Sequence, residues 1–427
     1  MSAQHDNINK LADHLFRHEA GRMVAILTKI FGTENLETAE DVVQDTIIQA
    51  MNTWKLKGIP ENPSAWLFSV ARNKAVDVIR RNKHSKNYDF NSGEKALLKS
   101  EYTMVTTMEN YFKEEAVKDE MLQMMFACCH PGISAENQVT LILKTLSGFS
   151  TTEIAHAFLV PEDTVSKRLY RTKEFFRSTK IKLEMPHENE IRSRTGAVLN
   201  AIYLIFNEGY NSAHSEELIR RDVIDEAFLL CKLLSENKLT GLPEVFALMA
   251  LMCFHAARLN ARLTGNGEII LLENQDRSKW DREMIDIGNY YMNRSAFGDE
   301  ISAYHIEAAI AYEHCIASTF NETNWKKVLQ YYDWLLKITP SPIVELNRAI
   351  AVMKVNGAKE ALEIMLEIKE QPILQKYYIA HAFLGEIYAG LGDENNAIAS
   401  YQKAMVLTQS IAEQSLLRKK IEKLLQA

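Results

Sequence analysis

The stretch 150–177 constrains the fold more than any other, because it reads as two short helices joined by a tight connection. Ser150 stands three residues before Glu153, which is the spacing of a capping box that starts a helix. Pro161 cannot continue that helix but suits the first turn of the next one. Residues 163–182 then hold seven Lys or Arg against two Asp or Glu. Together these features predict a helix-turn-helix, whose second helix lies in the major groove of DNA.

The second of these helices has an apolar side and a polar side. Val165 and Leu169 are four residues apart and can pack inward. The outward positions are polar or basic, and we expect them to contact DNA: Thr164, Ser166, Lys167, Arg168 and Arg171. The alternative is a surface helix hairpin with a solvated basic face. The coincidence of cap, proline and basic helix favours DNA binding.

Length and charge place this motif in a larger protein. A chain of 427 residues is expected to hold two to four domains, and 47% hydrophobic with 25% charged residues is ordinary globular composition. The net charge of −7 argues against a protein that is basic throughout. Residues 1–182 carry 24 Lys or Arg against 23 Asp or Glu, so the remaining 245 residues carry a net charge of −8. This favours an N-terminal part that binds polyanions and an acidic C-terminal part.

Five cysteines are present and form no CxxC pair: Cys128, Cys129, Cys231, Cys253 and Cys315. We interpret them as free thiols of a cytosolic protein. Adjacent cysteines such as Cys128 and Cys129 cannot easily both ligate one tetrahedral ion. A buried helix end before Pro131-Gly132 explains them better. We therefore expect no metal and no cofactor.

The N-terminal residues give no sign of export. Residues 1–20 are polar and charged, so we expect no signal peptide, and we expect no apolar run that approaches the ~20 residues of a membrane span. We expect a cytoplasmic protein without contact to a membrane.

Three helices are expected before residue 84, at about 8–31, 38–55 and 64–84. The second has a predicted core side that consists of Val42, Val43, Thr46, Ile47, Ala50 and Met51. Asn62 or Ser64 can cap the third helix. Residues 72–86 hold six basic residues and one acid, which suits contact with phosphates and bases, although a solvated basic face has the same composition.

The middle of the chain changes in character twice. Residues 84–118 are polar and irregular, and we interpret them as a flexible linker with at most one weak helix. The apolar pattern returns at Asp119. Residues 139–147 could form a strand, but their direct continuation into the helical motif favours a helix.

Beyond about residue 186 the sequence is helical in character. Gly265-Asn266-Gly267 indicates a turn, after which 268–272 could pair as a short strand. Near the C-terminus small and aromatic residues recur with spacings that resemble a tetratricopeptide (TPR) unit: Gly385, Tyr388, Ala397, Tyr401 and Ala404. Two or three such hairpins predict a solenoid that binds a protein or peptide, with a helical bundle that binds no partner as the alternative.

Three segments in this order resemble a bacterial RNA polymerase sigma factor of the extracytoplasmic-function (ECF) type, in the subgroup with a C-terminal TPR-like extension: AEDVVQDTIIQAMNTW, NPSAWLFSVARNKAVDVIRR and FSTTEIAHAFLVPEDTVSKRLYRTKEFFR. The resemblance implies an all-α fold with two small helical domains followed by a TPR-like solenoid. Residues 8–83 would be a region 2-like domain, 84–118 a linker, 119–182 a region 4-like domain and 186–427 the extension.

The resemblance also implies partners and roles. Core RNA polymerase would be bound by Asp41, Val42, Gln44 and Asp45. The opened −10 element of promoter DNA would be contacted by Asn62, Trp66, Asn73, Asp77, Arg80 and Arg81. The −35 element would be read by the outward residues of the basic helix. We further expect the acidic C-terminal part to regulate the rest, in cis or through a bound partner.

Other functions remain open at this point. A regulator that binds an operator alone and senses a signal through its TPR-like part would explain the helix-turn-helix and the solenoid, but not residues 36–83. An enzyme is disfavoured, because G-x-S-x-G, HExxH, P-loop and G-x-G-x-x-G motifs are absent from the sequence. A pure TPR scaffold would leave the basic helices unexplained.

Overall fold

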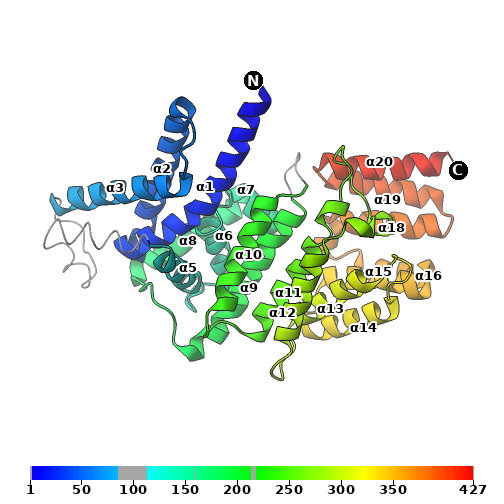
Figure 1. Cartoon of the computed structure of the whole chain (residues 1–427). Coiled ribbons are helices and arrows are strands. Elements are labelled where there is room, and N and C mark those ends of the chain that lie inside the picture. The colour runs from blue at the N-terminus through cyan, green and yellow to red at the C-terminus, as the bar shows by residue number, and fades with distance from the viewer. Residues whose placement is uncertain (1, 85–112, 159, 213–217, 427) are drawn as a thin grey trace. The chain divides into compact units, whose positions relative to one another are not determined.

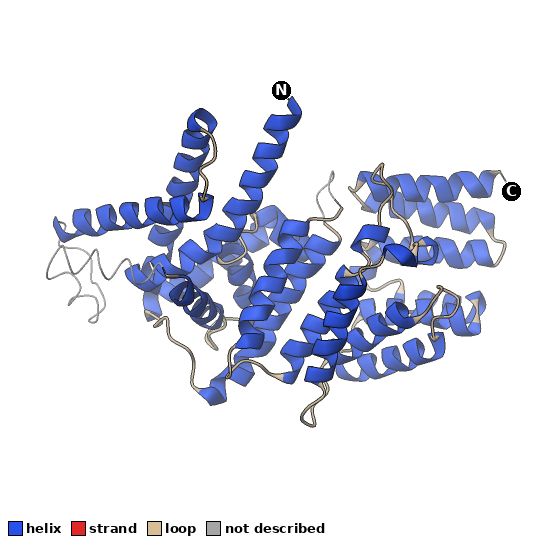
Figure 2. Ribbon diagram, in the orientation of Figure 1, coloured by secondary structure: helices blue, strands red, loops and turns tan. Residues whose placement is uncertain are grey.

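The computed structural model describes residues 2–84, 113–158, 160–212 and 218–426, which form helices joined by loops (Figures 1 and 2). The predicted all-α class is confirmed for these residues. The expected strand at 268–272 is wrong, because the structure has only an isolated antiparallel bridge between Leu263 and Ile269. The expected turn before it is present, with Gly267 at a φ of 79°. Most of the predicted linker, 85–112, lies outside the described residues.

The chain divides into two compact units. The first unit comprises Met1–Glu208 and Asp222–Thr240, and the second comprises Gly209–Arg221 and Gly241–Ala427. The boundary expected at residue 186 therefore differs from the division in the structure. Two helices of the predicted extension belong almost entirely to the first unit.

The first unit contains nine of the described α-helices. Their bounds are α1 Ser2–Phe31, α2 Leu36–Lys57, α3 Pro63–His84, α5 Glu114–Cys128, α6 Ala135–Thr145, α7 Thr151–Ala157, α8 Glu162–Thr179, α9 Glu188–Tyr210 and α10 Arg221–Glu236, with a 3₁₀ turn η1 at Thr33–Asn35. The helix expected at 139–147 is confirmed by α6. Pro161 lies at the N-cap of α8, just before its first turn.

Helix α1 is the central element of the first unit and packs against α2, α3 and α5. Leu27 and Phe31 of α1 and Leu67 of α3 are at most 1% exposed. Full burial of a side chain of this size contributes roughly 1.5–3 kcal/mol. Gly21 permits a close backbone approach, because a Cβ atom there would lie 1.8 Å from the carbonyl oxygen of Leu146. These packed helices bring the predicted region 2-like and region 4-like segments into one unit.

The second unit contains ten α-helices among its described residues. Their bounds are α11 Pro243–Ala256, α12 Arg282–Ser295, α13 Ala303–Ile316, α14 Trp325–Ile338, α15 Pro342–Asn356, α16 Ala358–Ile368, α17 Pro372–Gln375, α18 Tyr378–Gly390, α19 Glu394–Leu407 and α20 Ile411–Leu425, with 3₁₀ turns η3 Leu259–Ala261, η4 Leu272–Asn274 and η5 Arg277–Lys279. From α13 to α16, and again from α18 to α20, each helix packs against the next in the chain (Figure 1).

Helix α11 is the most apolar element of the second unit. The segment Pro243–Ala261 is the one described helical stretch that is long and apolar enough to cross a membrane, so the expectation that no such run exists was wrong. Within the structure 78% of its apolar window is buried. Helix α11 packs against α12 and α13, and a helix that is apolar on all sides is typical of a protein core.

The hairpin of α18 and α19 packs through small residues. Ala397 and Ala404 are fully buried, and they cluster with Tyr401 and the partly buried Tyr388. A Cβ atom at Gly385 would lie 2.5 Å from the ring of Tyr401. The absence of a side chain at Gly385 therefore lets the Tyr401 ring lie directly against α18.

Candidate functional site

Helices α7 and α8 present an exposed polar surface on a fixed base. The amide of Ser150 donates to Glu153 Oε2 over 2.6 Å, and the amide of Glu153 donates to Ser150 Oγ over 3.1 Å, so the expected capping box starts α7. Val165 and Phe176 are fully buried. Helix α8 packs against α6 and α7, and also against η1 and α2, so its exposed residues lie on the side that these elements leave uncovered.

The five predicted DNA contacts of α8 differ in exposure. Ser166, Lys167 and Arg171 are exposed, whereas Thr164 and Arg168 are half-buried. Arg168 lies 5.2 Å from the centre of the Phe158 ring and so ties α8 to the segment before it. Lys167 makes an exposed ion pair of 2.7 Å with Asp163 on its own helix.

The sequence pattern did not single out Tyr170, although it is the most conspicuous apolar group on this surface. Its side chain is 68% exposed, and it lies between Lys167 and Arg171 in the chain. A large aromatic ring at helical position i+4 from Ser166, between basic residues of the same helix, is the signal that could have identified it.

Helix α3 begins with a capping interaction and then exposes a polar side. Asn62 Oδ1 accepts a hydrogen bond of 2.9 Å from the amide of Ala65, which confirms the expected cap. Trp66 is half-buried with its ring edge-on to Trp54, 5.5 Å between centroids. The remaining predicted DNA-binding residues of this helix are polar and lie along its length: Asn73, Asp77, Arg80 and Arg81. All four are exposed.

Helix α2 exposes an acidic face with apolar residues in it. Asp41, Gln44 and Asp45 are exposed as predicted, but Val42 is only 5% exposed and belongs to the core. Met51, which was assigned to the core side, is 56% exposed instead. Ile48 is 48% exposed and was not singled out from the sequence. Residues 44, 48 and 51 follow helical spacing, so Ile48 and Met51 extend the face that Gln44 begins.

The N-terminal part of α2 pairs with the C-terminal end of α8. Glu40 lies 2.5 Å from Lys173, and Glu37 lies 2.7 Å from Arg177. Beyond α8, the carbonyl of Leu183 accepts a hydrogen bond of 2.7 Å from Lys29 of α1. From the sequence alone, Lys173 and Arg177 belong to the basic residues that were expected to bind DNA. The structure assigns them to a contact between α2 and α8.

Arg17 and His18 of α1 connect α7 to α10. Arg17 lies 3.2 Å from Glu153 of α7 and 3.7 Å from Asp222 of α10. His18 Nδ1 lies 3.1 Å from Glu226, whose side chain is almost inaccessible. The hydrogen bond to Glu226 raises the pKa of His18, and burial raises the pKa of Glu226. Both shifts favour the protonated forms of the two side chains in the folded protein.

In the second unit, three distant segments meet around Tyr210. Arg258 donates to the Tyr210 hydroxyl over 2.6 Å, and the Arg262 guanidinium lies 3.8 Å from the centre of its ring. Burial alone would raise the pKa of Tyr210, but the two guanidinium groups lower it overall. Arg277 donates to the carbonyls of His314 and Ala317 at the end of α13. These basic side chains therefore have a structural role in joining 209–211 and 258–280 to α13.

Comparisons with known proteins match separate parts of the chain. Residues 15–85, which include most of α1 with α2 and α3, match the family model Sigma-70 region 2. Residues 194–296 match the family of unknown function DUF6596. The ECF RNA polymerase sigma factor SigL of Mycobacterium tuberculosis (strain ATCC 25618 / H37Rv) is 29% identical over 143 residues, which cover 32% of this chain and 72% of SigL. SigL of strain CDC 1551 / Oshkosh matches equally.

One relative matches nearly the whole length. The uncharacterized protein R00370 of Rhizobium meliloti (strain 1021) is 33% identical over 397 residues, which cover 91% of this chain and 90% of that protein. The chain thus belongs to the family of R00370, with a Sigma-70 region 2 near its N-terminus, homology to ECF sigma factors over its N-terminal third and a DUF6596 segment after it.

Proposed function

We propose that the chain is an ECF-type sigma factor that binds core RNA polymerase and directs transcription from specific promoters. The match of residues 15–85 to Sigma-70 region 2 carries this proposal. The matched residues include α2 and α3, whose exposed residues suit polymerase binding and promoter recognition. The face of Asp41, Gln44, Asp45 and Ile48 on α2 would dock on the polymerase, because it combines charges with an exposed apolar side chain.

Helix α3 would hold the opened −10 element. Unstacking bases costs a few kcal/mol per step, and contacts to the released strand offset that cost. Arg80 and Arg81 supply cations for the backbone, while Asn73 and Asp77 can hydrogen-bond to bases. Asn62 would bind an extruded base through its amide nitrogen, since its Oδ1 already caps α3. Trp66 would support the site from the packed interior through Trp54.

Helices α7 and α8 would form the helix-turn-helix that reads the −35 element. Ser166, Lys167 and Arg171 would contact the duplex directly, with Tyr170 beside them. Thr164 would contact the DNA from its half-buried position near the start of α8. Arg168 would brace the helix against Phe158 and would also face the DNA backbone. A single helix of this kind supplies modest affinity, so polymerase would contribute the remainder.

The described arrangement of the first unit would have to open on a promoter. The two elements lie about 25 base pairs apart, which is roughly 85 Å of duplex at 3.4 Å per base pair. Helices α2 and α8 are in contact through Glu40–Lys173 and Glu37–Arg177. These pairs would break when α3 and α8 engage their separate elements.

The segment after α8 would regulate this opening. Asp222 and Glu226 of α10 hold Arg17 and His18, and Arg17 in turn holds α7. Any ligand that moves α10 would therefore change the support of the DNA-reading helices. We assign the second unit as the sensor, built as a TPR-like solenoid in which α18 and α19 form one repeat.

Binding to purified core polymerase tests the proposal. The full chain should co-elute with core polymerase in size-exclusion chromatography. The charge-reversed variant Asp41→Lys/Asp45→Lys should lose at least tenfold in affinity. The matched control is Glu363→Lys/Glu367→Lys, because these exposed acids of α16 have the same spacing in the second unit. A wild-type chain that does not bind core polymerase would refute the proposal.

A further inference from the structure

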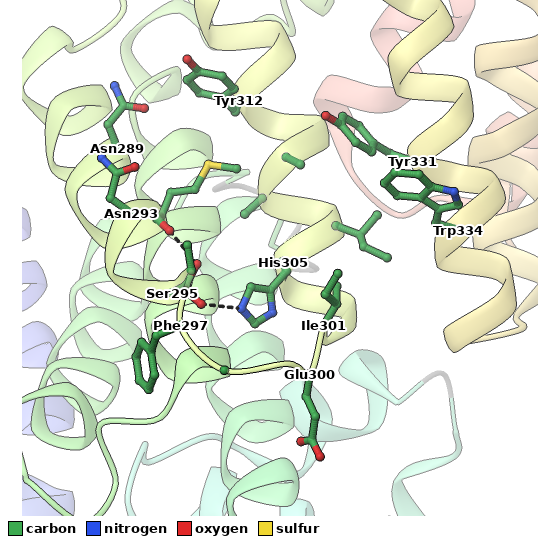
Figure 3. A pocket seen from close by; sticks show the side chains of 16 residues that line it. Asn289, Asn293, Ser295, Phe297, Glu300, Ile301, His305, Tyr312, Tyr331 and Trp334 are labelled. Atoms are coloured by element: carbon green, nitrogen blue, oxygen red, sulfur yellow. Dashed lines mark hydrogen bonds between the residues drawn. The ribbon is translucent and has the colours of Figure 1, made fainter.

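A cavity of about 780 Å³ opens in the second unit between α12, α13 and α14 (Figure 3). Its floor is formed by small residues of α13, with Ala308 and Ala309 among them. A volume of this size exceeds what a single side chain or a few water molecules need, and it falls in the range of sites that hold a ligand. None of the roles assigned above uses this cavity.

The rim of the cavity is held in place by His305. Its Nδ1 lies 3.1 Å from the amide and 2.8 Å from the hydroxyl of Ser302, and its Nε2 lies 3.2 Å from the carbonyl of Ser295. One imidazole thus fixes both ends of the connection from α12 to α13. The cavity is therefore built on a defined loop, and Ile301 on that loop is 63% exposed.

Two primary amides line one side of the cavity, and two aromatic rings line the other (Figure 3). Asn289 and Asn293 lie one turn apart on α12, and neither side chain has a hydrogen-bond partner among the described residues. Two such amides can both donate to and accept from the main chain of an extended peptide. They would thereby recognise a backbone whatever its sequence.

The aromatic side of the cavity can recognise a side chain of the ligand, in addition to the backbone contacts of the two amides. The rings of Tyr331 and Trp334 of α14 meet edge-on, 5.7 Å between centroids, and Trp334 is 43% exposed. Tyr312 of α13 packs against Phe254 of α11, 5.7 Å between centroids, which holds it at the cavity wall. Faces of Trp and Tyr attract cations, and they also accept the methylene groups of Lys and Arg.

The charge of the lining agrees with a cationic ligand. Glu300 is the only Asp, Glu, Lys or Arg among the described residues that line the cavity. The nearby Arg294 is directed elsewhere, with its guanidinium 4.0 Å from the centre of the Phe246 ring. A cation that enters the cavity would therefore meet several aromatic faces, without a lining Lys or Arg to repel it.

We propose that this cavity binds an extended segment of another protein that carries a Lys or Arg. The amides of Asn289 and Asn293 hold the peptide backbone, and the basic side chain lies against Tyr331 and Trp334. Occupation of the site is the event that the second unit senses, and for that consequence alone the inference rests on the proposed function. Binding itself requires neither polymerase nor DNA.

A selection on the full chain tests the inference. Random 12-residue peptides displayed on phage are selected on the immobilised protein, and the enriched sequences are synthesised. We expect a shared Lys or Arg in these peptides and at least a tenfold loss of affinity when norleucine replaces it. Trp334→Ala and Asn293→Ala should each weaken binding at least tenfold. Val406→Ala and Asn395→Ala are the matched controls, since both residues are exposed elsewhere in the second unit.

Circular dichroism of each variant separates loss of binding from loss of folding. The inference is overturned if no peptide is enriched, if the enriched peptides are acidic, or if they bind the folded Trp334→Ala and Asn293→Ala variants as tightly as the wild type. It is also overturned if the chain is a dimer that Trp334→Ala dissociates, because a second copy would then occupy the cavity. All of these outcomes leave the binding of core polymerase untouched.

Discussion

Individual residues decide how closely the elements of the first unit approach. Gly21 shows this best, because the nearest atoms to its missing side chain belong to the backbone of Leu146. Backbone atoms cannot rotate away as the end of a flexible side chain can. The close approach of α1 to the end of α6 therefore depends on a glycine in the middle of a helix, where alanine would otherwise be preferred.

Gly21→Ala should destabilise the first unit by about 1–3 kcal/mol despite its better helix propensity, since the new methyl group forces the helices apart. The control is Gly196→Ala in α9, where a Cβ atom would meet nothing within 4 Å. That variant should gain up to about 1 kcal/mol. Urea unfolding followed by circular dichroism measures both, and equal stability of the two variants would contradict the close approach.

The pair of His18 and Glu226 predicts how stability depends on pH. The pKa of each side chain is raised in the folded protein, so the folded state binds more protons than the unfolded state. The stability contributed by His18 is complete below its ordinary pKa of 6.5 and is lost as the pH rises through the raised value. Glu19 adds to the rise and Arg22 opposes it.

Through His18 alone, the unfolding free energy should accordingly fall as the pH rises from 6 to 8, against the opposite contribution of four histidines whose pKa is lowered: His130, His255, His314 and His381. In His18→Gln, which keeps a hydrogen-bonding side chain but cannot be protonated, the contribution of His18 should be absent. A slope that is unchanged by the substitution would show that other groups govern the pH dependence.

At the scale of elements, the sequence predicted where helices form and which of their faces are polar better than it predicted the contacts between helices. The capping box of α7, the helix at 139–147 and the polar side of α3 all follow from local spacing. The contact between α2 and α8 could not be predicted, because Lys173 and Arg177 have the same local signature whether they face DNA or an acid of another helix. The same limit explains why the sequence placed Val42 both in the core and on the binding surface and did not predict the exposure of Met51, since both depend on where neighbouring helices end.

The exposed face of α8 predicts a specific response to salt. Lys167→Ala/Arg171→Ala should weaken binding to a promoter duplex and reduce the slope of log K against log[salt] by about 2, one unit for each phosphate that is no longer neutralised. On a short duplex that holds the −35 element alone, Lys173→Ala/Arg177→Ala should leave the slope unchanged, because these residues then still face α2. Fluorescence anisotropy at several salt concentrations distinguishes the two variants, and identical slopes would contradict the assignment of the faces.

The ion pairs between α2 and α8 predict a reversible opening. Spin labels on cysteines placed at the exposed Ser69 of α3 and Ser178 of α8 report the distance between these helices, since the five native cysteines are all buried. Glu37→Lys/Glu40→Lys should lengthen this distance by repulsion. Adding Lys173→Glu/Arg177→Glu should restore it. A distance that does not respond to the first pair of changes would show that these ion pairs do not hold α8.

The whole molecule is organised around a division that the sequence did not reveal. The family model of unknown function begins at residue 194, yet α10 within that range belongs to the first unit. The reason is local: Asp222 and Glu226 of α10 find their partners on α1, far away in sequence. The helical character of the sequence beyond residue 186 predicted helices such as α10 but carried no information about which core would bury them.

The cavity of the second unit was likewise invisible in the sequence. Asn289, Tyr312 and Trp334 come from three successive helices, and no motif links them. By contrast, the spacing of small and aromatic residues near the C-terminus indicated that Gly385 and Tyr401 would lie in one helical hairpin. Local spacing specifies packing within one hairpin, whereas a cavity depends on the stacking of several helices.

Transcription in vitro tests the central claim most directly. The purified chain is mixed with core RNA polymerase and a set of promoter fragments from its own genome, and the transcripts are mapped. We predict initiation at one defined position on a subset of fragments, abolished by Asp41→Lys/Asp45→Lys and retained with Glu363→Lys/Glu367→Lys. Initiation that is no different from core polymerase alone on every fragment would contradict the assignment of the chain as a sigma factor.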